Sequence, residues 1–594
     1  MAAKGYDPGF VGPSYQAPMA LQDAENCINW YVEVAEVDGA KEPVALLGCP
    51  GLNAVISTIT GQVRGLWVLP GGLTALAVVG NTVYLISQTT AATATQIAQF
   101  STSYLGTMAT NSGPVCIRDN GVQFNGSGGY AVICDGTTNL YFYNIGSTPT
   151  STTSFTFTGS VASGSTTITL PGTLPTGLLL SPNVPIFDSA GALPVGGGTY
   201  IASINYAAPS ITLSAAAVAT ATNDTFTLSI PRFGVLTDPG YLGSTRCTFV
   251  EGWLTFNQPG TRTFFQTGPV PYTLTFPGTM YALKDSSTDN IVTQFENDRE
   301  VWFVGERTSE VWYNAGNSSG VSFSRVPAVG PQVGCSATHS ITRLGQNLAW
   351  LARNEQGENV VIQTNQYSYD RISNHAIEAA IASYPLISDA IGYAYEEAGH
   401  VFYVLIFPTA DTTWVYDVTA SAYLQKPCWH QRLSYNSSTG QFHRHRSNCY
   451  MNMQNLRLVG DYQTGQIHQM SRNYYTDNGA LLKCQRRAKH VWSKGNRERV
   501  FQTSMQVEFT PGVGLQSGQG STPQAMLRWS NDGSFTWSNE HWQSIGMAGQ
   551  TRNRAKWNRL GNARDRVYEL NFTDPVPRDI IGATLFAESE EEVA

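Results

Sequence analysis

The chain contains few charged residues and no segment suited to a membrane. Asp, Glu, Lys and Arg make up 13% of its 594 residues, against roughly a quarter in an average globular domain. Its most apolar run, Val401 to Phe407, is far too short to span a bilayer. The first ten residues lack the apolar region of a secretory signal. We therefore expect a protein made in the cytoplasm of its host, with no membrane partner.

Paired cysteines and reactive groupings are also scarce. The nine cysteines are scattered without tight spacing, which excludes a disulfide scaffold and fits folding in a reducing compartment. The glycine clusters at 196–198 and 512–520 have no following Lys-Ser or Lys-Thr, so neither is expected to cradle a phosphate. No Ser-His-Asp or Cys-His grouping is evident. We expect no enzymatic activity and no cofactor.

The chain is instead rich in strand and turn sequence. Gly, Ser and Thr replace the missing charge, and a hydrophobic content of 42% is enough for a sizeable core. From residue 63 onward, a loose unit of strands and tight turns recurs every 40–50 residues or so, within the range of propeller blades. Six or seven such units are visible, near 63–86, 112–145, 242–268, 289–316, 337–373, 388–432 and 441–474.

These patterns predict an all-β protein with a six- or seven-bladed β-propeller. A stacked pair of β-sandwiches would show similar turn spacing. The only convincing helix is expected at His375 to Ala382. We divide the chain into an irregular N-terminal segment (1–62), a first part of the propeller (63–145), an inserted small β module (146–232), the rest of the propeller (233–474) and a C-terminal antiparallel β domain (475–594).

The inserted module and the C-terminal tail differ in composition from the rest of the chain. Residues 146–232 are rich in Ser, Thr and Gly and contain no Lys or Arg before Arg232. Their β-branched runs favour a folded β module over a disordered linker. The acidic tail at Glu588 to Glu592 is expected to be disordered.

Charge is distributed unevenly along the chain. The net charge is −8; residues 475–594 hold 15 basic and 13 acidic residues, and the other residues hold 20 and 30. Proteins that wrap DNA present a broad positive field, so this chain is not expected to be one. If DNA passes the protein, most of the surface should repel its phosphates.

The stretch 521–583 predicts antiparallel strands with an embedded basic run. Two alternating segments, Met526 to Ser530 and Val567 to Asn571, are accompanied by the turn sequences Asn531-Asp532-Gly533 and Gly561-Asn562. The basic run is expected to contact a neighbouring subunit, DNA phosphates in a channel, or solvent with partners on its own chain; we favour the subunit contact. Its members are Arg552, Arg554, Lys556, Arg559, Arg564 and Arg566.

Two groups of residues contain side-chain types found in metal sites or in glycosidases. Cys428 and His430 precede a turn, and His443 and His445 follow it. If this is one hairpin, His430 would face His443 and Cys428 would face His445, which are zinc-ligand types. Such residues more often line a polar sheet face, and we expect no metal.

The second group runs from Ser530 to Trp537 and resembles the Asp-box of sialidases. An Asp-box is also a turn device in which the Asp side chain caps backbone N–H groups. The arginine triad, Tyr nucleophile and acid that sialidases use are not evident, so a sialidase-like glycosidase is disfavoured.

The C-terminal stretch 521–583, the segment Glu25 to Tyr31 and the turn Gly48 to Gly51 together resemble the tail nozzle proteins of short-tailed bacteriophages, also called packaged-DNA stabilisation proteins. The resemblance implies a virion protein that forms a homo-oligomeric ring, typically of six copies, below the portal and its adaptor ring. It also implies retention of packaged DNA without sequence-specific binding, closure by a needle or plug, and docking of tail spikes or fibres.

The main alternative is a receptor-binding propeller that recognises a host glycan or protein. It would use aromatic-rich loops near Trp302, Trp312 and Trp414.

Overall fold

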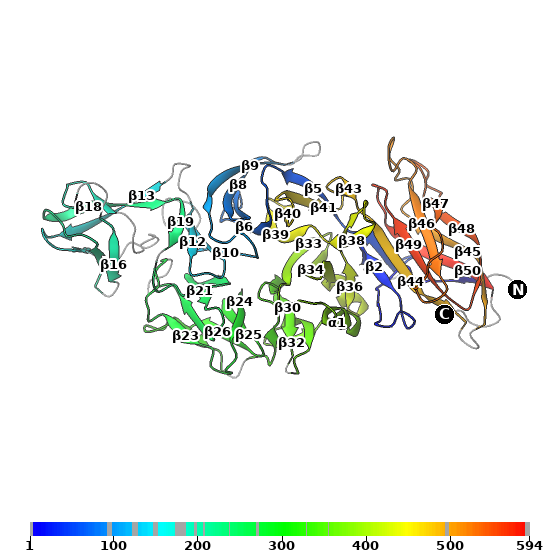
Figure 1. The fold of residues 1–594 in the computed structure, drawn as a ribbon, viewed down its shortest axis with the longest axis horizontal. Helices are drawn as coiled ribbons and strands as arrows, with labels where there is room; N and C mark the ends of the chain where they lie inside the picture. The colour runs from blue at the N-terminus through cyan, green and yellow to red at the C-terminus, as the bar shows by residue number, and fades with distance from the viewer. Residues whose placement is uncertain are drawn as a thin grey trace.

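Three β-rich parts follow one another along the long axis of the molecule (Figure 1). An inserted module lies at one end, a propeller in the middle and a β-sandwich at the other end, where both chain termini also lie. The computed structural model describes residues 4–37, 39–91, 98–121, 129–145, 152–172, 186–194, 199–205, 208–236, 238–268, 273–327, 330–354, 356–493 and 498–588.

Seven blades of antiparallel strands form the propeller, so the upper of the two predicted blade numbers holds for the described residues. The first blade contains β6 (Val63–Val68), β7 (Thr74–Val79), β8 (Thr82–Thr90) and β9 (Gln99–Thr107). The second contains β10 (Cys116–Asp119), β11 (Tyr130–Cys134), β12 (Leu140–Asn144) and β19 (Phe233–Leu236). The third contains β20 (Cys247–Val250), β21 (Trp253–Asn257), β22 (Thr263–Gln266) and β23 (Tyr281–Leu283).

The remaining blades complete the circle. The fourth contains β24 (Ile291–Asn297), β25 (Glu300–Gly305), β26 (Ser309–Asn314) and β27 (Phe323–Arg325). The fifth contains β28 (Gly334–Cys335), β29 (Thr342–Leu344), β30 (Asn347–Arg353), β31 (Asn359–Asn365) and β32 (Ser368–Arg371). The sixth contains β33 (Ile391–Glu397), β34 (His400–Phe407), β35 (Thr412–Asp417) and β36 (Cys428–Gln431). The seventh contains β39 (Ser447–Met453), β40 (Leu456–Asp461), β41 (Ile467–Ser471) and β5 (Gly51–Ile56).

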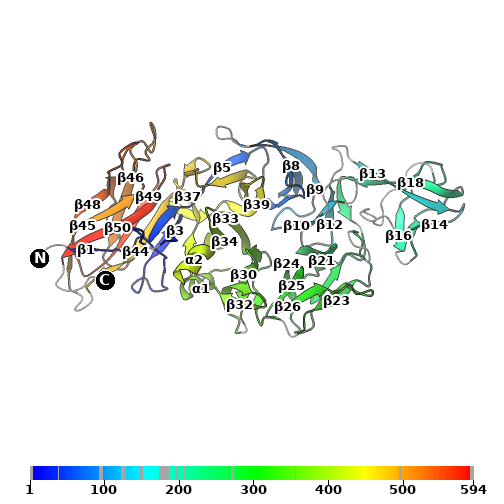
Figure 2. The same ribbon diagram turned by 180° about the vertical axis from the view of Figure 1, so that it is seen from behind.

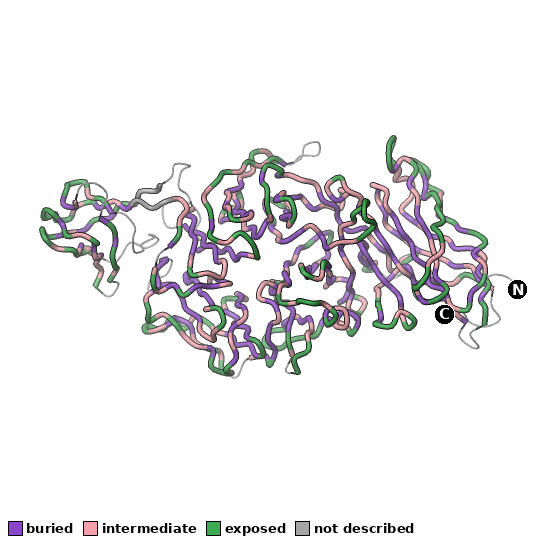
Figure 3. The backbone as a smooth tube through the Cα atoms, in the orientation of Figure 1, coloured by how far each residue is buried: buried purple, intermediate pink, exposed green. Residues whose placement is uncertain are grey.

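Apolar residues hold the blades together because each central strand is covered on both faces. In β25, Val301 and Phe303 join the core shared with blade three, whereas Trp302 and Val304 join the core shared with blade five. Successive side chains of a strand point to opposite faces, so a continuous apolar run is what a strand between two blades requires. The buried backbone therefore concentrates in the blade centres (Figure 3).

The propeller is closed by a strand from near the start of the chain. β5 pairs antiparallel with β41, with Gly51 opposite Ser471 and Ile56 opposite Ile467. Figure 2 shows this blue strand within the yellow seventh blade. A Cβ atom on Gly51 would lie 2.3 Å from the carbonyl oxygen of Tyr474, so only glycine allows this approach.

The inserted module lies between β12 and β19 of the second blade. These two strands pair directly, with Tyr143 opposite Phe233, so the ends of the insertion are close together and the insertion costs little loop entropy. The core of the module includes Phe157 and Phe226, whose rings stack at 5.6 Å. Its strands are β13 (Thr152–Val161), β14 (Thr167–Thr169), β15 (Ile186–Asp188), β16 (Ile201–Asn205), β17 (Ser210–Leu213) and β18 (Ala221–Pro231).

Two sheets form the C-terminal sandwich. One contains β1 (Lys4–Tyr6), β3 (Trp30–Val34), β4 (Val44–Gly48), β50 (Ile580–Glu588), β45 (Val500–Phe509) and β48 (Ala555–Ala563). The other contains β2 (Asn26–Ile28), β44 (Cys484–Trp492), β49 (Asp565–Phe572), β46 (Gln524–Ser530) and β47 (His541–Ser544). Trp557, Met505, Leu527 and Leu570 are among the residues that fill the space between them.

Short elements complete the fold of the described residues. They are the hairpin β37 (Leu433–Asn436) and β38 (Gln441–Arg444), the strands β42 (Thr476–Asp477) and β43 (Ala480–Leu481), and the helices α1 (His375–Ala382) and α2 (Val418–Leu424). Helix α1 has the predicted bounds, and Asn374 caps it by accepting a hydrogen bond from the N–H of Ile377. Helix α2 was not predicted; Asp417 caps it, and it ends at Gln425, which has φ 53°.

The predicted all-β class, with a propeller, an inserted module and a C-terminal β domain, is confirmed. Two local expectations differ from the structure. Gly561 and Asn562 lie within β48 rather than in a turn, because Gly561, with φ 77°, forms part of an irregularity in the pairing with β45. The N-terminal segment is more regular than expected, since it supplies β1 to β5. Most of the acidic tail lies outside the described residues.

Candidate functional site: the junction of propeller and sandwich

One continuous sheet joins the propeller to the sandwich. β2 pairs parallel with β36 of the sixth blade, with Ile28 beside Gln431, and antiparallel with β44 of the sandwich. The resulting sheet has nine strands and runs from β33 to β47. The two parts therefore share backbone hydrogen bonds rather than a flexible connection.

Asn29, directly after β2, is bonded to both parts. Its side-chain N–H groups donate to the carbonyl oxygens of Leu433 at 2.8 Å and Lys483 at 2.7 Å, and its Oδ1 accepts from the N–H of Leu433 at 3.0 Å. The residue is fully buried and has φ 59°, a conformation that asparagine tolerates better than most residues. Asn29 thus fixes the turn between β2 and β3 against two distant segments.

Three buried arginines bind the carbonyl oxygens of the N-terminal segment. Arg432 donates to the carbonyl of Pro50 at 2.6 Å, and Arg578 donates to that of Cys49 at 2.9 Å. Arg486 donates to four or more carbonyls in the first 26 residues, among them that of Phe10 at 2.8 Å. Among the described residues, none of the three forms an ion pair with a carboxylate. Carbonyl dipoles therefore replace the hydration that each buried guanidinium loses.

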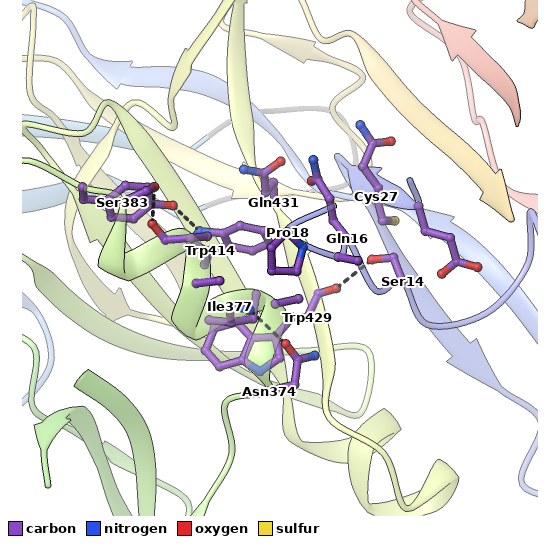
Figure 4. A pocket seen from close by; sticks show the side chains of 17 residues that line it. Ser14, Gln16, Pro18, Cys27, Asn374, Ile377, Ser383, Trp414, Trp429 and Gln431 are labelled. Atoms are coloured by element: carbon purple, nitrogen blue, oxygen red, sulfur yellow. Dashed lines mark hydrogen bonds between the residues drawn. The ribbon is translucent and has the colours of Figure 1, made fainter. Parts of the chain in front are cut away.

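A pocket of about 440 Å³ opens beside this junction (Figure 4). It lies between helix α1, the strands β35 and β36, and the N-terminal segment, with Ser14 and Pro18 on the N-terminal side. The indole N–H of Trp414 donates to the hydroxyl of Tyr384 at 2.8 Å, and that of Trp429 donates to the carbonyl of Ile372 at 2.8 Å. The indole donors are satisfied within the chain, so the two tryptophans offer ring faces to the pocket, beside polar side chains such as Gln16 and Gln431.

Five members of the predicted basic run are exposed, and the sixth is not. Arg552, Arg554, Lys556, Arg559 and Arg564 are exposed on β48 and its flanking residues. Arg566 is only 3% exposed and donates to the carbonyl of Leu560 at 2.6 Å and to Oδ1 of Asn531 at 2.8 Å. Its place in the interior removes Arg566 from any contact with a subunit or DNA.

The exposed cations lie on a sheet edge. β48 is the last strand in its sheet, and within the described part of the chain no strand pairs with its outer side. Arg554 pairs with Glu508 at 3.4 Å, and Lys41 pairs with the same carboxylate at 3.0 Å. An edge strand with unpaired backbone groups can add to a second sheet, and charges such as these decide which partner it accepts.

The four zinc-ligand candidates do not come together. In the hairpin β37–β38, Ser434 rather than His430 faces His443, because β36 pairs with β35 and β2 instead of β38. His443 bonds Asp411 at 2.6 Å, and His445 bonds the hydroxyl of Ser447 at 2.7 Å. Cys428 and His430 are buried in β36. Within the described ranges, no group of three His, Cys, Asp or Glu side chains is placed to hold a metal.

The segment that resembles an Asp-box is a turn device. Oδ1 of Asp532 accepts hydrogen bonds from the N–H groups of Phe535 and Thr536, and Oδ2 accepts one from the Thr536 hydroxyl at 2.6 Å. These hydrogen bonds, those from Thr536 above all, lower the pKa of Asp532 to about 2. Trp537 lies under the guanidinium groups of Arg487 and Arg528. The Asp532 carboxylate and the Trp537 ring thus have structural roles in this turn.

The aromatic residues named for receptor binding are committed to the fold. Trp302 is 1% exposed and lies between blades, with Trp350 at 6.5 Å. The indole N–H of Trp312 donates to Glu310 at 2.9 Å. Trp414 lines the junction pocket. These side chains therefore do not form an exposed aromatic loop cluster.

The architecture is a seven-bladed propeller continued into a β-sandwich by a shared sheet. Two family models match these two parts. A model described as bacteriophage P22 Gp10, beta-propeller, matches residues 252–475, and one described as bacteriophage P22 Gp10, beta-sandwich, matches residues 484–588. Together they span more than half of the chain. The chain belongs to the family of bacteriophage P22 Gp10, the tail nozzle and DNA-stabilisation proteins of short-tailed phages. It is a structural protein of the phage tail and a component of the virion.

Other comparisons add little. No curated protein matches the chain. Among solved structures, the N-terminal domain of Nup159 is 7% identical, with a TM-score of 0.34 over 75% of this chain and 98% of that one. Hsv2 of Kluyvelomyces marxianus is 8% identical, with a TM-score of 0.23 over 64% and 96%. Neither score supports an inference. Within the described residues, no helix has both the length and the apolar character needed to cross a membrane.

Replacing Asn29 with alanine should weaken the junction severely. Three buried backbone groups would lose their partner at about 1–3 kcal/mol each, so we expect a loss of roughly 3 kcal/mol or more in the free energy of unfolding. Asn223→Ala is the matched control, because Asn223 also has a left-handed φ, 51°, but is exposed. It should cost about 1 kcal/mol or less. Denaturant titration measures both, and equal losses would contradict the assigned role of Asn29.

His430 should make stability depend on pH. Burial, with the nearby Arg432 charge, lowers its pKa from 6.5 to about 3. Between these values the unfolded chain binds a proton that the folded chain does not, so stability is full above pH 6.5 and falls as the pH decreases. From pH 7.5 to pH 5, this histidine should account for a loss of about 2 kcal/mol.

The substitution His430→Phe should remove that share of the pH dependence, since the ring can still pack against Tyr31 and Phe402. His541→Phe, at an exposed position, should keep the dependence of the unsubstituted protein. Urea titrations at the two pH values compare them. An unchanged dependence in His430→Phe would rule out the proposed buried neutral histidine.

Proposed function

We propose that this protein is the subunit of the ring-shaped tail nozzle, which extends the DNA channel below the portal and its adaptor ring. The nine-stranded sheet carries this proposal, together with the family to which the chain belongs. A ring subunit must hold its interfaces at a fixed angle to close the ring. A sheet shared by the propeller and the sandwich, locked by Asn29 and three buried arginines, supplies that fixed angle.

We propose a homo-hexameric ring with an interface that includes the basic edge of β48. Exposed cations on an edge strand suit a heterologous contact with an acidic face of the next subunit, and the other residues supply such faces because they carry the excess of acidic residues. Six copies with a net charge of −8 each would carry −48. Such a channel repels DNA phosphates, so DNA can slide without being gripped.

The proposed partners follow from the order of parts along the molecule. The sandwich and the inserted module lie at opposite ends of the propeller (Figure 1), so they offer separate surfaces. We propose that these surfaces contact the adaptor ring, the tail spikes or fibres, and the needle or plug that retains the packaged DNA. No sequence-specific DNA contact is part of this proposal.

Charge reversal on β48 tests the subunit contact. The double substitution Arg554→Glu and Arg559→Glu should weaken self-association at least about tenfold, because like charges at an interface cost several kcal/mol. Arg299→Glu with Arg262→Glu is the matched control, since it makes the same change of charge at two propeller positions, of which Arg299 is exposed and Arg262 partly exposed. Analytical ultracentrifugation measures both variants. Equal association of the two variants would exclude this edge from the interface.

Particles assembled without this chain test the function itself. We expect heads that package DNA and then lose it, with truncated tails in electron micrographs. Full, stable heads with intact tails that fail only to adsorb would instead make the chain a receptor-binding protein, and the nozzle proposal would be wrong. Particles that leak although they retain complete tails would also contradict it.

A further inference from the structure

A cavity of about 200 Å³ lies on the axis of the propeller. Residues from or next to the innermost strand of each of the seven blades line it, so it lies where the blades meet around the propeller axis. A single water molecule needs about 10–15 Å³ of cavity volume, so this cavity can hold a ligand larger than one water molecule. The residues that matter here are Arg64, Arg118, Arg246, Phe295 and His339.

Two of these arginines are buried without a full set of partners. Arg118 and Arg246 are each 9% exposed, and their guanidinium carbons both lie 5.5 Å from the centre of the Phe295 ring. Nη1 of Arg118 donates to the carbonyl of its neighbour Ile117 at 2.9 Å, and Nη2 of Arg246 donates to that of Ile341 at 3.4 Å. Nε of each has no hydrogen-bond partner. Among the described residues, nothing bonds Nη2 of Arg118 or Nη1 of Arg246 either.

In contrast, the guanidinium nitrogens of Arg64, which also lines this cavity, have hydrogen-bond acceptors within the chain. Its three nitrogens donate to the carbonyl oxygens of Gly80, Thr110, Ser112 and Gly113, and to the hydroxyl of Thr110. A buried guanidinium normally finds such partners, because each buried N–H group without an acceptor costs a large part of its desolvation energy. The free donors of Arg118 and Arg246 therefore call for an acceptor that is not part of the chain.

The carboxylates of Glu296 and Asp119 both act on the charge of Arg118. Glu296 approaches Nε of Arg118 at 3.4 Å, and its charge also acts on Arg246. Asp119 already accepts a hydrogen bond from the indole N–H of Trp67 at 2.6 Å. Burial, with the Arg246 charge, lowers the pKa of His339 to about 3, so His339 is neutral near pH 7. Burial also lowers the pKa of Arg246 itself.

We propose that the axial cavity binds one small oxyanion of the phosphate class between Arg118 and Arg246. Guanidinium groups present planar forks of donors that match the oxygens of phosphate or carboxylate, and such charge-assisted bonds are about twice as strong as neutral ones. The anion would accept hydrogen bonds from the free Nη2 of Arg118 and Nη1 of Arg246. It would also tie the inner strand β10 of blade two to β20 of blade three.

Calorimetric titration of the full-length protein with inorganic phosphate, at constant ionic strength in chloride, tests the site. We expect one phosphate per chain. Arg246→Met, which keeps the length of the side chain but removes the fork, should weaken binding at least about tenfold. Arg262→Met, at a partly exposed propeller position outside the cavity lining, should bind like the unsubstituted protein. No measurable binding by the unsubstituted protein, or equal binding by Arg246→Met, would overturn the proposal.

A second variant keeps the test decisive if Arg246→Met does not fold. Glu296→Gln removes the competing carboxylate, one oxygen of which has no hydrogen-bond partner. It should tighten phosphate binding roughly tenfold, since two negative charges that share a site repel each other. Unchanged affinity in this variant would contradict the site.

A single-stranded oligonucleotide distinguishes free phosphate from a DNA phosphodiester. A free-anion site inside the propeller should not release phosphate when the oligonucleotide is added. Displacement that depends on Arg246 would make DNA the ligand and the free-anion proposal wrong.

Discussion

The fold depends on how the N-terminal segment is held between the propeller and the sandwich. β2 supplies the strand that joins two sheets, Asn29 bonds both sides, and β5 closes the seventh blade. Asn29 meets Leu433 and Lys483 across more than 400 residues of sequence, so these contacts form only when most of the chain is in place. Closure of the propeller and its attachment to the sandwich therefore depend on the same stretch of about thirty residues. Neither the propeller nor the sandwich is complete without that stretch.

Buried arginines stabilise the N-terminal segment between the propeller and the sandwich. The N-terminal segment crosses the interior partly as irregular backbone, and its carbonyl groups need donors there. Arg432, Arg486 and Arg578 supply several donors each from fixed strands or turns. An apolar residue at these positions would leave the carbonyls unpaired, and lysine would offer a single point charge instead of a planar fork. Among the described residues, Arg118 and Arg246 each donate to only one carbonyl oxygen, and we therefore propose them as a binding element.

Sequence patterns anticipated the elements that depend on local information. The blades were visible because each needs apolar strands and tight turns, and α1 was visible because Asn374 and an alanine-rich run favour a capped helix. Helix α2 was missed because it is short and follows β35 directly. The partners of His430 and His443 could not be predicted, because register depends on which distant strand pairs with β36. Arg566 resembled its exposed neighbours in sequence, and only the tertiary fold buries it.

The two attachments of the propeller differ physically, and the difference bears on the proposed nozzle. The sandwich is joined by a shared sheet and by buried polar bonds from several segments, so a load on one part passes to the other through backbone hydrogen bonds. The inserted module interrupts the second blade between β12 and β19, which pair directly with each other, and its buried apolar residues form one cluster with those of blades two and three. In a ring built from this subunit, the rigidly joined propeller and sandwich would thus set the angle between neighbouring subunits. The module would then be free to vary with the partner it contacts, because changes in it leave the ring interfaces intact.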